Sequence, residues 1–247
     1  MDTRKWWSPA LGQDMELKVY GGGGKPVLVF PSGGGRFHEY EDFGMVEACR
    51  PFLDQGRIQL FTVDSVDHQS LYNRSLPPAD RIRRHEQYEA YVREEVVPFI
   101  RDRNPSGGLL VTTGCSGGGY HSANFLLRHP DLCDAVIALS GLYGPRFAFG
   151  DRWDGSQYFH FPLAYLPGLQ DERQLGLLRR SKIVLCVGQG DWETCADYDC
   201  IGDARAMKYV LEAKGIPAWV DFWGTDVDHD WTWWRRQLPY FLDHVLG

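Results

Sequence analysis

Short apolar runs rich in β-branched residues recur along the chain, and each ends in small or polar residues. They lie at residues 25–32, 58–65, 109–116, 135–141, 182–189 and 218–224. Because these runs are apolar throughout rather than alternating, they are typical of strands buried on both faces of a mainly parallel sheet. Residues 15–20 predict a first antiparallel strand, which turns at the four glycines that follow it.

Helical patterns separate these predicted strands. The first helix opens at Pro78, and four apolar residues spaced by four, four and three positions share one of its faces: Tyr88, Val92, Val96 and Phe99. Three more helices are predicted at residues 118–129, 199–214 and 231–246, the last with a kink at Pro239. This alternation predicts one α/β domain over residues 1–247, built on a doubly wound, mainly parallel sheet.

Residues 142–180 break the alternation of strand and helix. Eight aromatic residues occur there without a clear period: Tyr143, Phe147, Phe149, Trp153, Tyr158, Phe159, Phe161 and Tyr165. Long structureless loops are usually functional or disordered, and so many aromatics argue against disorder. We expect this insert to form a lid or pocket wall in which Trp153 and Phe159 contact the substrate. The alternative is an ordinary excursion that packs its own small cluster.

Composition and charge narrow the possible functions. The chain has 26 Lys and Arg against 33 Asp and Glu, which gives a formal net charge of −7. It has no cluster of basic residues that could bind the phosphates of a nucleic acid. We therefore expect no nucleic-acid partner. No apolar run reaches the roughly 20 residues of a membrane span, and the first residues lack the apolar core of a signal peptide. We expect a cytoplasmic protein without a membrane partner, and homo-oligomer formation stays open.

The cysteines and glycines fit no common metal or nucleotide motif. Six cysteines occur without a CxxC pair, and we expect reduced, mostly buried thiols, although Cys195 and Cys200 are close enough in sequence for a bridge or a metal pair. Glu89 stands where a zincin helix starting at His85 needs its second histidine, so a solvated helix face is expected there, and no metal site. The glycine-rich segments match neither the dinucleotide-binding pattern nor the P-loop.

Residues 114–118, Gly-Cys-Ser-Gly-Gly, fit the pattern G-x-S-x-G. They close a predicted buried strand and open a predicted helix, which is the strand–turn–helix setting of a nucleophile elbow. Ser116 would then hold a strained backbone position, with glycines that let helix and strand approach closely. The alternative is a glycine-rich turn with a helix-capping serine.

A nucleophilic serine needs a histidine base that follows it in the chain. In hydrolases with this elbow the order is serine, acid, histidine, and only His229 and His244 of the eight histidines lie late enough. His244 falls near the end of the last predicted helix, where a surface position is expected. His229 lies in a polar loop directly after the strand at 218–224. The sequence therefore predicts His229 as the base.

An oxyanion hole needs two converging backbone N–H groups. The residue after the nucleophile, Gly117, supplies one, and Gly33 or Ser32 at the exit of the strand at 25–32 supplies the other. Three further polar residues follow the strand at 58–65 and either rim the pocket or form a plain polar loop: Asp64, Asp67 and His68.

The acid that orients the histidine should lie just past the strand at 182–189. Residues 190–193, Gly-Asp-Trp-Glu, offer two carboxylates there. Asp191 follows the strand immediately, whereas Glu193 is one carbon longer and reaches from farther along the loop. A third candidate, Asp226, lies in the loop of His229.

Residues 114–121 (Gly-Cys-Ser-Gly-Gly-Gly-Tyr-His), 128–131 (Arg-His-Pro-Asp) and 138–141 (Ala-Leu-Ser-Gly) resemble the putative-esterase family of α/β hydrolases. This family includes esterase D-type S-formylglutathione hydrolases, feruloyl esterases and the antigen 85 mycolyltransferases. Residues 229–234, His-Asp-Trp-Thr-Trp-Trp, resemble its histidine loop, and the resemblance covers roughly residues 26–240.

The resemblance implies an α/β-hydrolase fold and a Ser–His–acid triad that hydrolyses carboxylic esters without a cofactor. Similar esterases often read Gly-x-Trp-Glu at residues 190–193, so the resemblance favours Glu193 over Asp191. Two departures matter. Gly117 stands where members often carry Met, and the aromatic insert matches no single subgroup.

We therefore expect a serine carboxylesterase that acts on a small-molecule ester through an acyl-enzyme. An acyltransferase of the same fold would share that acyl-enzyme and pass the acyl group to an alcohol instead of water. A non-catalytic binding protein of the same fold is the remaining alternative, because fold alone does not establish activity.

Overall fold

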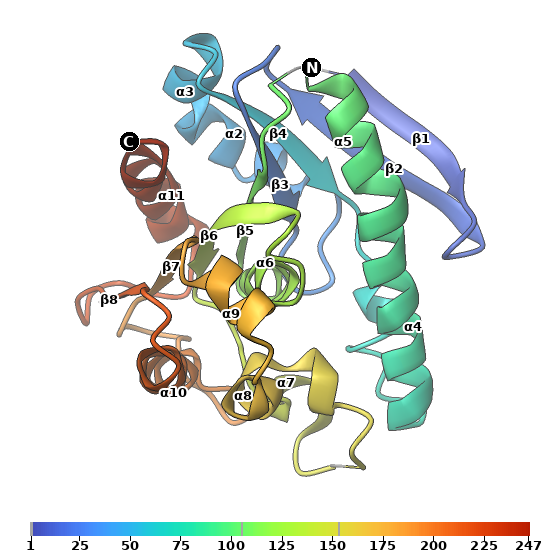
Figure 1. Ribbon diagram of the computed structural model, residues 1–247, viewed down its shortest axis with the longest axis vertical. Helices are drawn as coiled ribbons and strands as arrows, with labels where there is room; N and C mark the ends of the chain where they lie inside the picture. The colour runs from blue at the N-terminus through green and yellow to red at the C-terminus, as the bar shows by residue number, and fades with distance from the viewer. Residues whose placement is uncertain (1, 105, 153) are drawn as a thin grey trace.

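One mixed sheet organises the chain. The computed structural model describes residues 2–104, 106–152 and 154–247, and in that part of the chain eight strands lie in the order β1-β2-β4-β3-β5-β6-β7-β8 (Figure 1). The strands are β1 (Asp2–Ser8), β2 (Gln13–Tyr20), β3 (Lys25–Phe30), β4 (Ile58–Val63), β5 (Leu110–Cys115), β6 (Cys133–Leu139), β7 (Lys182–Val187) and β8 (Trp219–Phe222). The pairs β1–β2 and β2–β4 are antiparallel, and all other pairs are parallel.

The six apolar runs of the sequence form the parallel strands, and the predicted antiparallel strand is β2. Strand β1, which pairs with β2 at the edge of the sheet, was not among the predicted strands. The reason is its composition: most of its side chains are polar or exposed, and Trp6 packs inward, 5.7 Å from the ring of Phe99 and 5.9 Å from that of Tyr91.

Helices cover both faces of the sheet, which makes it doubly wound. One face carries α4 (Pro78–Tyr91), the π-helix η2 (Val92–Val96), α5 (Val97–Arg103), α6 (Gly117–Arg128), α9 (Glu172–Leu178) and α10 (Cys200–Ala213). The opposite face carries α1 (Glu39–Asp42), α2 (Met45–Ala48), α3 (Arg50–Asp54) and α11 (Trp231–Leu246). In Figure 1, α4 and α5 run along one side of the sheet, and α11, α2 and α3 lie on the other.

Pro98 and Pro239 lie within the longer helical segments without ending them. Pro98 has no N–H to donate to the preceding turn, and the π-helix η2 lies immediately before the α5 segment that contains it. Pro239 lies inside α11, which continues to Leu246. Among the described residues no helix is both long and apolar enough to cross a membrane.

The insert at 142–180 folds into short helices rather than a structureless loop. These are α7 (Arg146–Phe149), η3 (Tyr158–His160), α8 (Pro162–Tyr165) and η4 (Leu166–Gly168), followed by α9. Phe147 and Phe161 pack on Tyr120 of α6 at ring distances of 5.3 and 5.4 Å. Because Tyr120 lies in the first turn of α6 after Ser116, the insert covers the end of this helix that carries Ser116. Trp153 lies outside the described residues.

Candidate active site

Ser116 occupies a strained turn between β5 and α6. Its backbone angles are φ 56° and ψ −119°, a region that costs free energy for any residue with a side chain. A Cβ added to Gly114 would lie 2.4 Å from the carbonyl carbon of Gly118, so only glycine lets strand and helix approach here. The Ser116 hydroxyl makes no capping hydrogen bond to α6. The alternative of a helix-capping serine is therefore wrong, and the turn has the geometry of a nucleophile elbow.

His229 lies in the loop between β8 and α11, and its ring is held from several sides. Its backbone N–H donates to the carbonyl of Asp191 at 2.9 Å, and its Nδ1 lies 3.0 Å from Glu193 Oε2. The ring of Trp234 packs against it edge-on at 4.9 Å, with Tyr198 at 5.7 Å. A histidine whose Nδ1–H faces a carboxylate keeps Nε2 as the proton acceptor.

Glu193 is a fully buried carboxylate with a complete set of partners. Oε2 faces His229, while Oε1 accepts hydrogen bonds from the Ser140 hydroxyl at 2.7 Å and the Gly188 N–H at 3.0 Å. The indole N–H of Trp234 donates to the same Ser140 hydroxyl at 3.0 Å. These neutral donors satisfy the hydrogen-bonding needs of the carboxylate without cancelling its charge. The negative charge of Glu193 therefore acts on His229.

A thiol also lies against this pair. Cys200 Sγ is 3.9 Å from His229 Nδ1 and donates to the Ser140 carbonyl at 3.4 Å. Burial, with the negative charge of Glu193 nearby, raises the pKa of Cys200 well above its ordinary value. The thiol therefore stays protonated and neutral beside the carboxylate. All six cysteines are unpaired, so Cys195 and Cys200 form no bridge.

The other two candidate acids do not reach His229. The side chain of Asp191 is exposed, and this residue contributes only backbone groups: its carbonyl holds His229, and its N–H donates to Asp228 at 2.8 Å. Asp226 is also exposed. Of the three carboxylates that the sequence proposed, the one in contact with His229 is Glu193.

Gly33 and Gly117 meet at the nucleophile. A Cβ added to Gly117 would lie 2.8 Å from Gly33 Cα and 2.9 Å from its nitrogen, so a side chain at Gly117 would drive the two segments apart. The hydroxyl of Tyr72 lies there as well, 3.0 Å from the same Cβ position. Burial, with Asp67 nearby, raises the pKa of Tyr72, which therefore keeps its proton and can donate it in a hydrogen bond.

Two buried carboxylates fix the loop that carries Gly33. Glu39 accepts the Ser32 N–H at 2.7 Å and also the Ser32 hydroxyl. Asp67 lies at the start of the short helix η1 (Asp67–Gln69), accepts the Gly34 N–H at 3.2 Å and contacts His121 Nε2 at 2.9 Å. Asp67 is thus a support of the loop, whereas the buried Asp64 pairs with Arg36 and His68 is exposed.

The structure describes one of the two predicted substrate contacts, Phe159. The exposed Phe159 accepts a hydrogen bond through its carbonyl from Arg128, the last residue of α6. Arg128 and Ser116 are about 18 Å apart along the helix axis, whereas the carbonyl of His160, the residue after Phe159, accepts from Tyr120 in the first turn of α6 at 2.8 Å. The role of Phe159 in substrate binding stays a prediction, and the other predicted contact, Trp153, lies outside the described residues.

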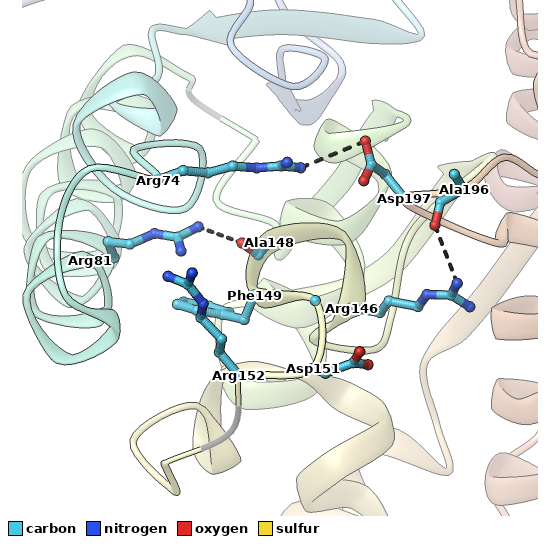
Figure 2. A pocket seen from close by; sticks show the side chains of 10 residues that line it. Arg74, Arg81, Arg146, Ala148, Phe149, Asp151, Arg152, Ala196 and Asp197 are labelled. Carbon is cyan, nitrogen blue, oxygen red and sulfur yellow. Dashed lines mark hydrogen bonds and ion pairs between the residues drawn. The ribbon is translucent and has the colours of Figure 1, made fainter.

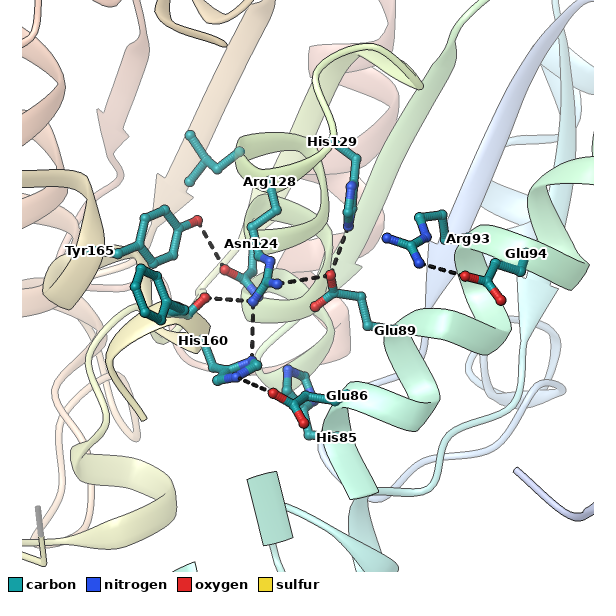
Figure 3. Close-up of polar contacts among 12 residues, drawn as sticks. His85, Glu86, Glu89, Arg93, Glu94, Asn124, Arg128, His129, His160 and Tyr165 are labelled. Carbon is teal, nitrogen blue, oxygen red and sulfur yellow. Dashed lines mark hydrogen bonds and ion pairs between the residues drawn. The ribbon is translucent and has the colours of Figure 1, made fainter. Parts of the chain in front are cut away.

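Two groups of side chains bring metal-type donor atoms within 4.8 Å of one another. One is Glu193, Cys200 and His229, where carboxylate and imidazole already pair. The other is His85, Glu89 and His160, shown in Figure 3. There Glu89 accepts from His129 at 2.8 Å and pairs with Arg128 at 3.2 Å, while Arg128 also contacts His160 at 3.1 Å. The guanidinium of Arg128 therefore already occupies the position between Glu89 and His160 where a metal ion would bind.

His85 itself corrects a prediction. The sequence pattern favoured a solvated helix face at His85, but the side chain is 2% exposed, and burial lowers its pKa well below the ordinary value. The error follows from α4: its face toward α6 and the insert is buried, and the Tyr120 hydroxyl lies 3.1 Å from His85 Nε2.

Solved structures of other proteins share the fold of this chain. The S-formylglutathione hydrolase of Agrobacterium tumefaciens is 14% identical, with coverage of 99% of this chain and 95% of that one, at a TM-score of 0.77. A ferulic acid esterase is 17% identical, with coverage of 99% of this chain and 97% of that one, at a TM-score of 0.76. MPT51 of Mycobacterium tuberculosis is also 17% identical, with coverage of 100% and 98% and a TM-score of 0.73. At such identities the likeness shows the fold, which is that of the α/β hydrolases. No curated protein sequence matches significantly.

Family membership comes from the sequence profile of a family rather than from single relatives. The family described as putative esterase matches residues 8–244, which is nearly the whole chain and includes both the elbow and the histidine loop. The chain therefore belongs to the putative-esterase family and is a carboxylic ester hydrolase with the α/β-hydrolase fold.

Proposed function

We propose that this enzyme hydrolyses a small-molecule carboxylic ester through an acyl-enzyme on Ser116, with His229 as base and Glu193 as the acid of the triad. The observation that carries the proposal is the contact of 3.0 Å between His229 Nδ1 and the fully buried Glu193. Glu193 also accepts from Ser140, the residue after Leu139, whose carbonyl accepts the N–H of the strained Ser116. A strained serine, a histidine base and an orienting acid are the three parts that activate a hydroxyl nucleophile.

In the first half of the reaction, Ser116 Oγ attacks the ester carbonyl carbon and its proton passes to His229 Nε2. The carbonyl oxygen becomes an oxyanion, which the N–H groups of Gly117 and Gly33 stabilise, with the Tyr72 hydroxyl beside them. Gly117 opens α6, so its N–H also carries the positive end of the helix dipole. The carbon–oxygen bond to the alcohol then breaks, and His229 gives its proton to the leaving oxygen.

In the second half, a water molecule attacks the acyl-enzyme and gives a proton to His229. The bond to Ser116 Oγ breaks, the serine recovers its proton, and the carboxylic acid leaves. Glu193 keeps its charge throughout, holds the imidazole in one tautomer and stabilises the imidazolium in both halves. Ser140 and Gly188 hold this carboxylate in place by their hydrogen bonds.

Labelling with a fluorophosphonate probe tests the proposal, since the probe traps an activated serine. We expect one label per chain, mapped by peptide mass spectrometry to Ser116, and no label in Ser116→Ala. This variant should lose roughly 10⁴–10⁶ in kcat on an activated ester, whereas Ser75→Ala at an exposed turn serves as a control with full rate. A label on another residue, or a tenth of the rate left in Ser116→Ala, would overturn the proposal. Product analysis with an added alcohol separates hydrolysis from acyl transfer.

A further inference from the structure

A cavity of about 330 Å³ is lined by an unusual number of arginines (Figure 2). Three segments build it: the chain after η1, the region around α7, and the loop after Glu193. Its charged lining consists of Arg74, Arg81, Arg146, Arg152, Asp151 and Asp197. The chain as a whole is acidic, with a formal charge of −7, so this concentration of positive charge is a local feature.

The cavity is connected to the catalytic machinery through neighbouring residues. Arg74 comes two residues after Tyr72, whose hydroxyl lies next to Gly33 and Gly117. Asp197 precedes Tyr198, whose ring lies 5.7 Å from that of His229. Each of these wall segments therefore reaches from the arginines to a residue that borders the proposed oxyanion hole or the base.

Arg81 brings a buried positive charge to the cavity. Its side chain is 4% exposed, and its guanidinium donates to the main-chain carbonyls of Ser70, Leu71 and Ala148. Its Cζ lies 4.1 Å from the ring centre of Phe149. Carbonyls and an aromatic ring orient a guanidinium without neutralising it, and no carboxylate of the described residues pairs with Arg81.

The neighbouring arginines add to this charge instead of balancing it. Figure 2 shows the guanidinium of Arg152 directed toward Arg81, and Arg74 extending across the same space. Burial and repulsion by Arg74 and Arg152 lower the pKa of Arg81, which places the three guanidinium groups within one another's field. The closest carboxylate contact in the group is the loose pair of Arg74 with Asp197 at 3.7 Å, while Asp151 points away from Arg81.

We propose that this arginine pocket binds a negatively charged oxygen group of the ester substrate, such as a carboxylate, sulfate or phosphate, while the ester itself lies at Ser116. The planar guanidinium forms paired hydrogen bonds to such groups, and the excess of arginines over aspartates in the lining gives a positive field that concentrates anionic ligands. The proposal rests on the proposed function and names its substrate class: esters that carry a second, anionic group.

Matched pairs of esters test the inference on both sides of the scissile bond. On the acyl side, 4-nitrophenyl hexanoate is compared with the 4-nitrophenyl monoester of adipic acid, which places a carboxylate at the end of the same chain. On the alcohol side, methyl 4-acetoxybenzoate is compared with 4-acetoxybenzoate. The variants are Arg74→Gln and Arg152→Gln, both exposed, and Arg93→Gln is the control because this arginine pairs with Glu94 on the remote helix η2.

We expect the wild-type enzyme to favour the anionic member of at least one pair. Arg74→Gln and Arg152→Gln should each lower kcat/KM for that ester at least about tenfold, with less than about a twofold change for its neutral partner. Added sulfate or phosphate should inhibit the anionic ester competitively in the wild type and less in the variants.

Three outcomes would overturn the inference: no anionic preference, a preference that survives both substitutions, or equal losses on neutral and anionic esters. None of these outcomes would argue against Ser116 as the nucleophile, because hydrolysis of the neutral hexanoate depends on this serine whether or not the pocket binds an anion. Failure of the proposed function would instead show as hydrolysis of both esters by Ser116→Ala.

Discussion

Two of the places where the described residues bring histidine and carboxylate side chains together differ in their surroundings, and one of the two has the parts of a catalytic site. The acid–histidine pair, Glu193 and His229, lies at the carboxyl edge of the sheet. The insert cluster, His85, Glu89 and His160, lies where α4 faces α6 and the insert (Figure 3). Both are largely buried, and both contain a histidine close to a carboxylate.

The difference lies in what else touches the carboxylate. In the insert cluster Arg128 and His129 both contact Glu89, so its charge is partly neutralised by a permanent cation. These contacts lower the pKa of Glu89 in spite of its burial. In the acid–histidine pair Glu193 contacts neutral donors, and its remaining oxygen faces one imidazole. A buried carboxylate gives its full electrostatic effect to a histidine only where no other cation competes for it.

The largest expected effect separates the two regions directly. His229→Ala should lower kcat by roughly 10⁴–10⁶, because the base is lost, while His160→Ala in the insert cluster should change kcat/KM by less than about threefold. Steady-state kinetics on one activated ester, with circular dichroism to confirm folding, measure both. A His160 variant as damaged as the His229 variant would remove the distinction.

Tyr72→Phe sharpens the picture of the oxyanion hole. Loss of a hydroxyl that borders both glycines should lower kcat by roughly 10- to 100-fold, with KM nearly unchanged, because the hydrogen bond is needed when the oxyanion forms. Tyr209→Phe on the surface is the matched control. If KM rises while kcat stays constant, Tyr72 binds the substrate rather than the transition state.

Ser140→Ala tests the support of the buried acid. The change removes a donor to Glu193 and the acceptor of the Trp234 indole, so the free energy of unfolding should fall by about 1–3 kcal/mol. We also expect kcat to fall about tenfold as the carboxylate loses its position. Urea unfolding and kinetics are compared with Ser181→Ala, which removes a bond to a backbone carbonyl far from the site. If Ser140→Ala changes neither the free energy of unfolding nor kcat, the hydrogen bonds of Ser140 do not support Glu193.

The smallest effect concerns pH and the insert cluster. Burial lowers the pKa of His85 well below its ordinary value of about 6.5, so the unfolded chain binds this proton more readily than the folded one. The contribution of neutral His85 to stability is present above about pH 6.5 and is lost as pH falls toward the lowered folded pKa. Urea midpoints between pH 7.5 and 5 should fall less steeply in His85→Gln than in the wild type. Parallel curves would contradict this assignment.

Much of the site could be predicted because its chemistry is local in sequence. The elbow at Ser116 needs a strand, a sharp turn and glycines in one short stretch, and Gly33 and Gly117 follow from the same rule. His229 follows from chain order. Residues Ser140 and Trp234 belong to the stretches that resemble the family, but nothing in their spacing indicated that both would lie against the triad acid.

Other features depend on distant segments that only the folded chain brings together. Tyr72 carries no motif, and its place beside the two glycines follows from how the loop after β4 packs on α6. The arginine pocket combines residues from three separate segments. The same reason applies to the insert: its aromatic residues predict burial, but not that Phe159 would be exposed while Phe147 and Phe161 are buried.

The most direct test of the account is the identity of the acid that serves His229. Glu193→Gln and Asp191→Asn keep the size of each side chain and remove its charge, and both are measured side by side on one activated ester. We predict that Glu193→Gln loses about 10²–10⁴ in kcat, because a neutral amide neither fixes the tautomer nor stabilises the imidazolium, and that Asp191→Asn keeps most of its rate. A loss of a hundredfold or more in Asp191→Asn, with Glu193→Gln nearly unaffected, would contradict the account.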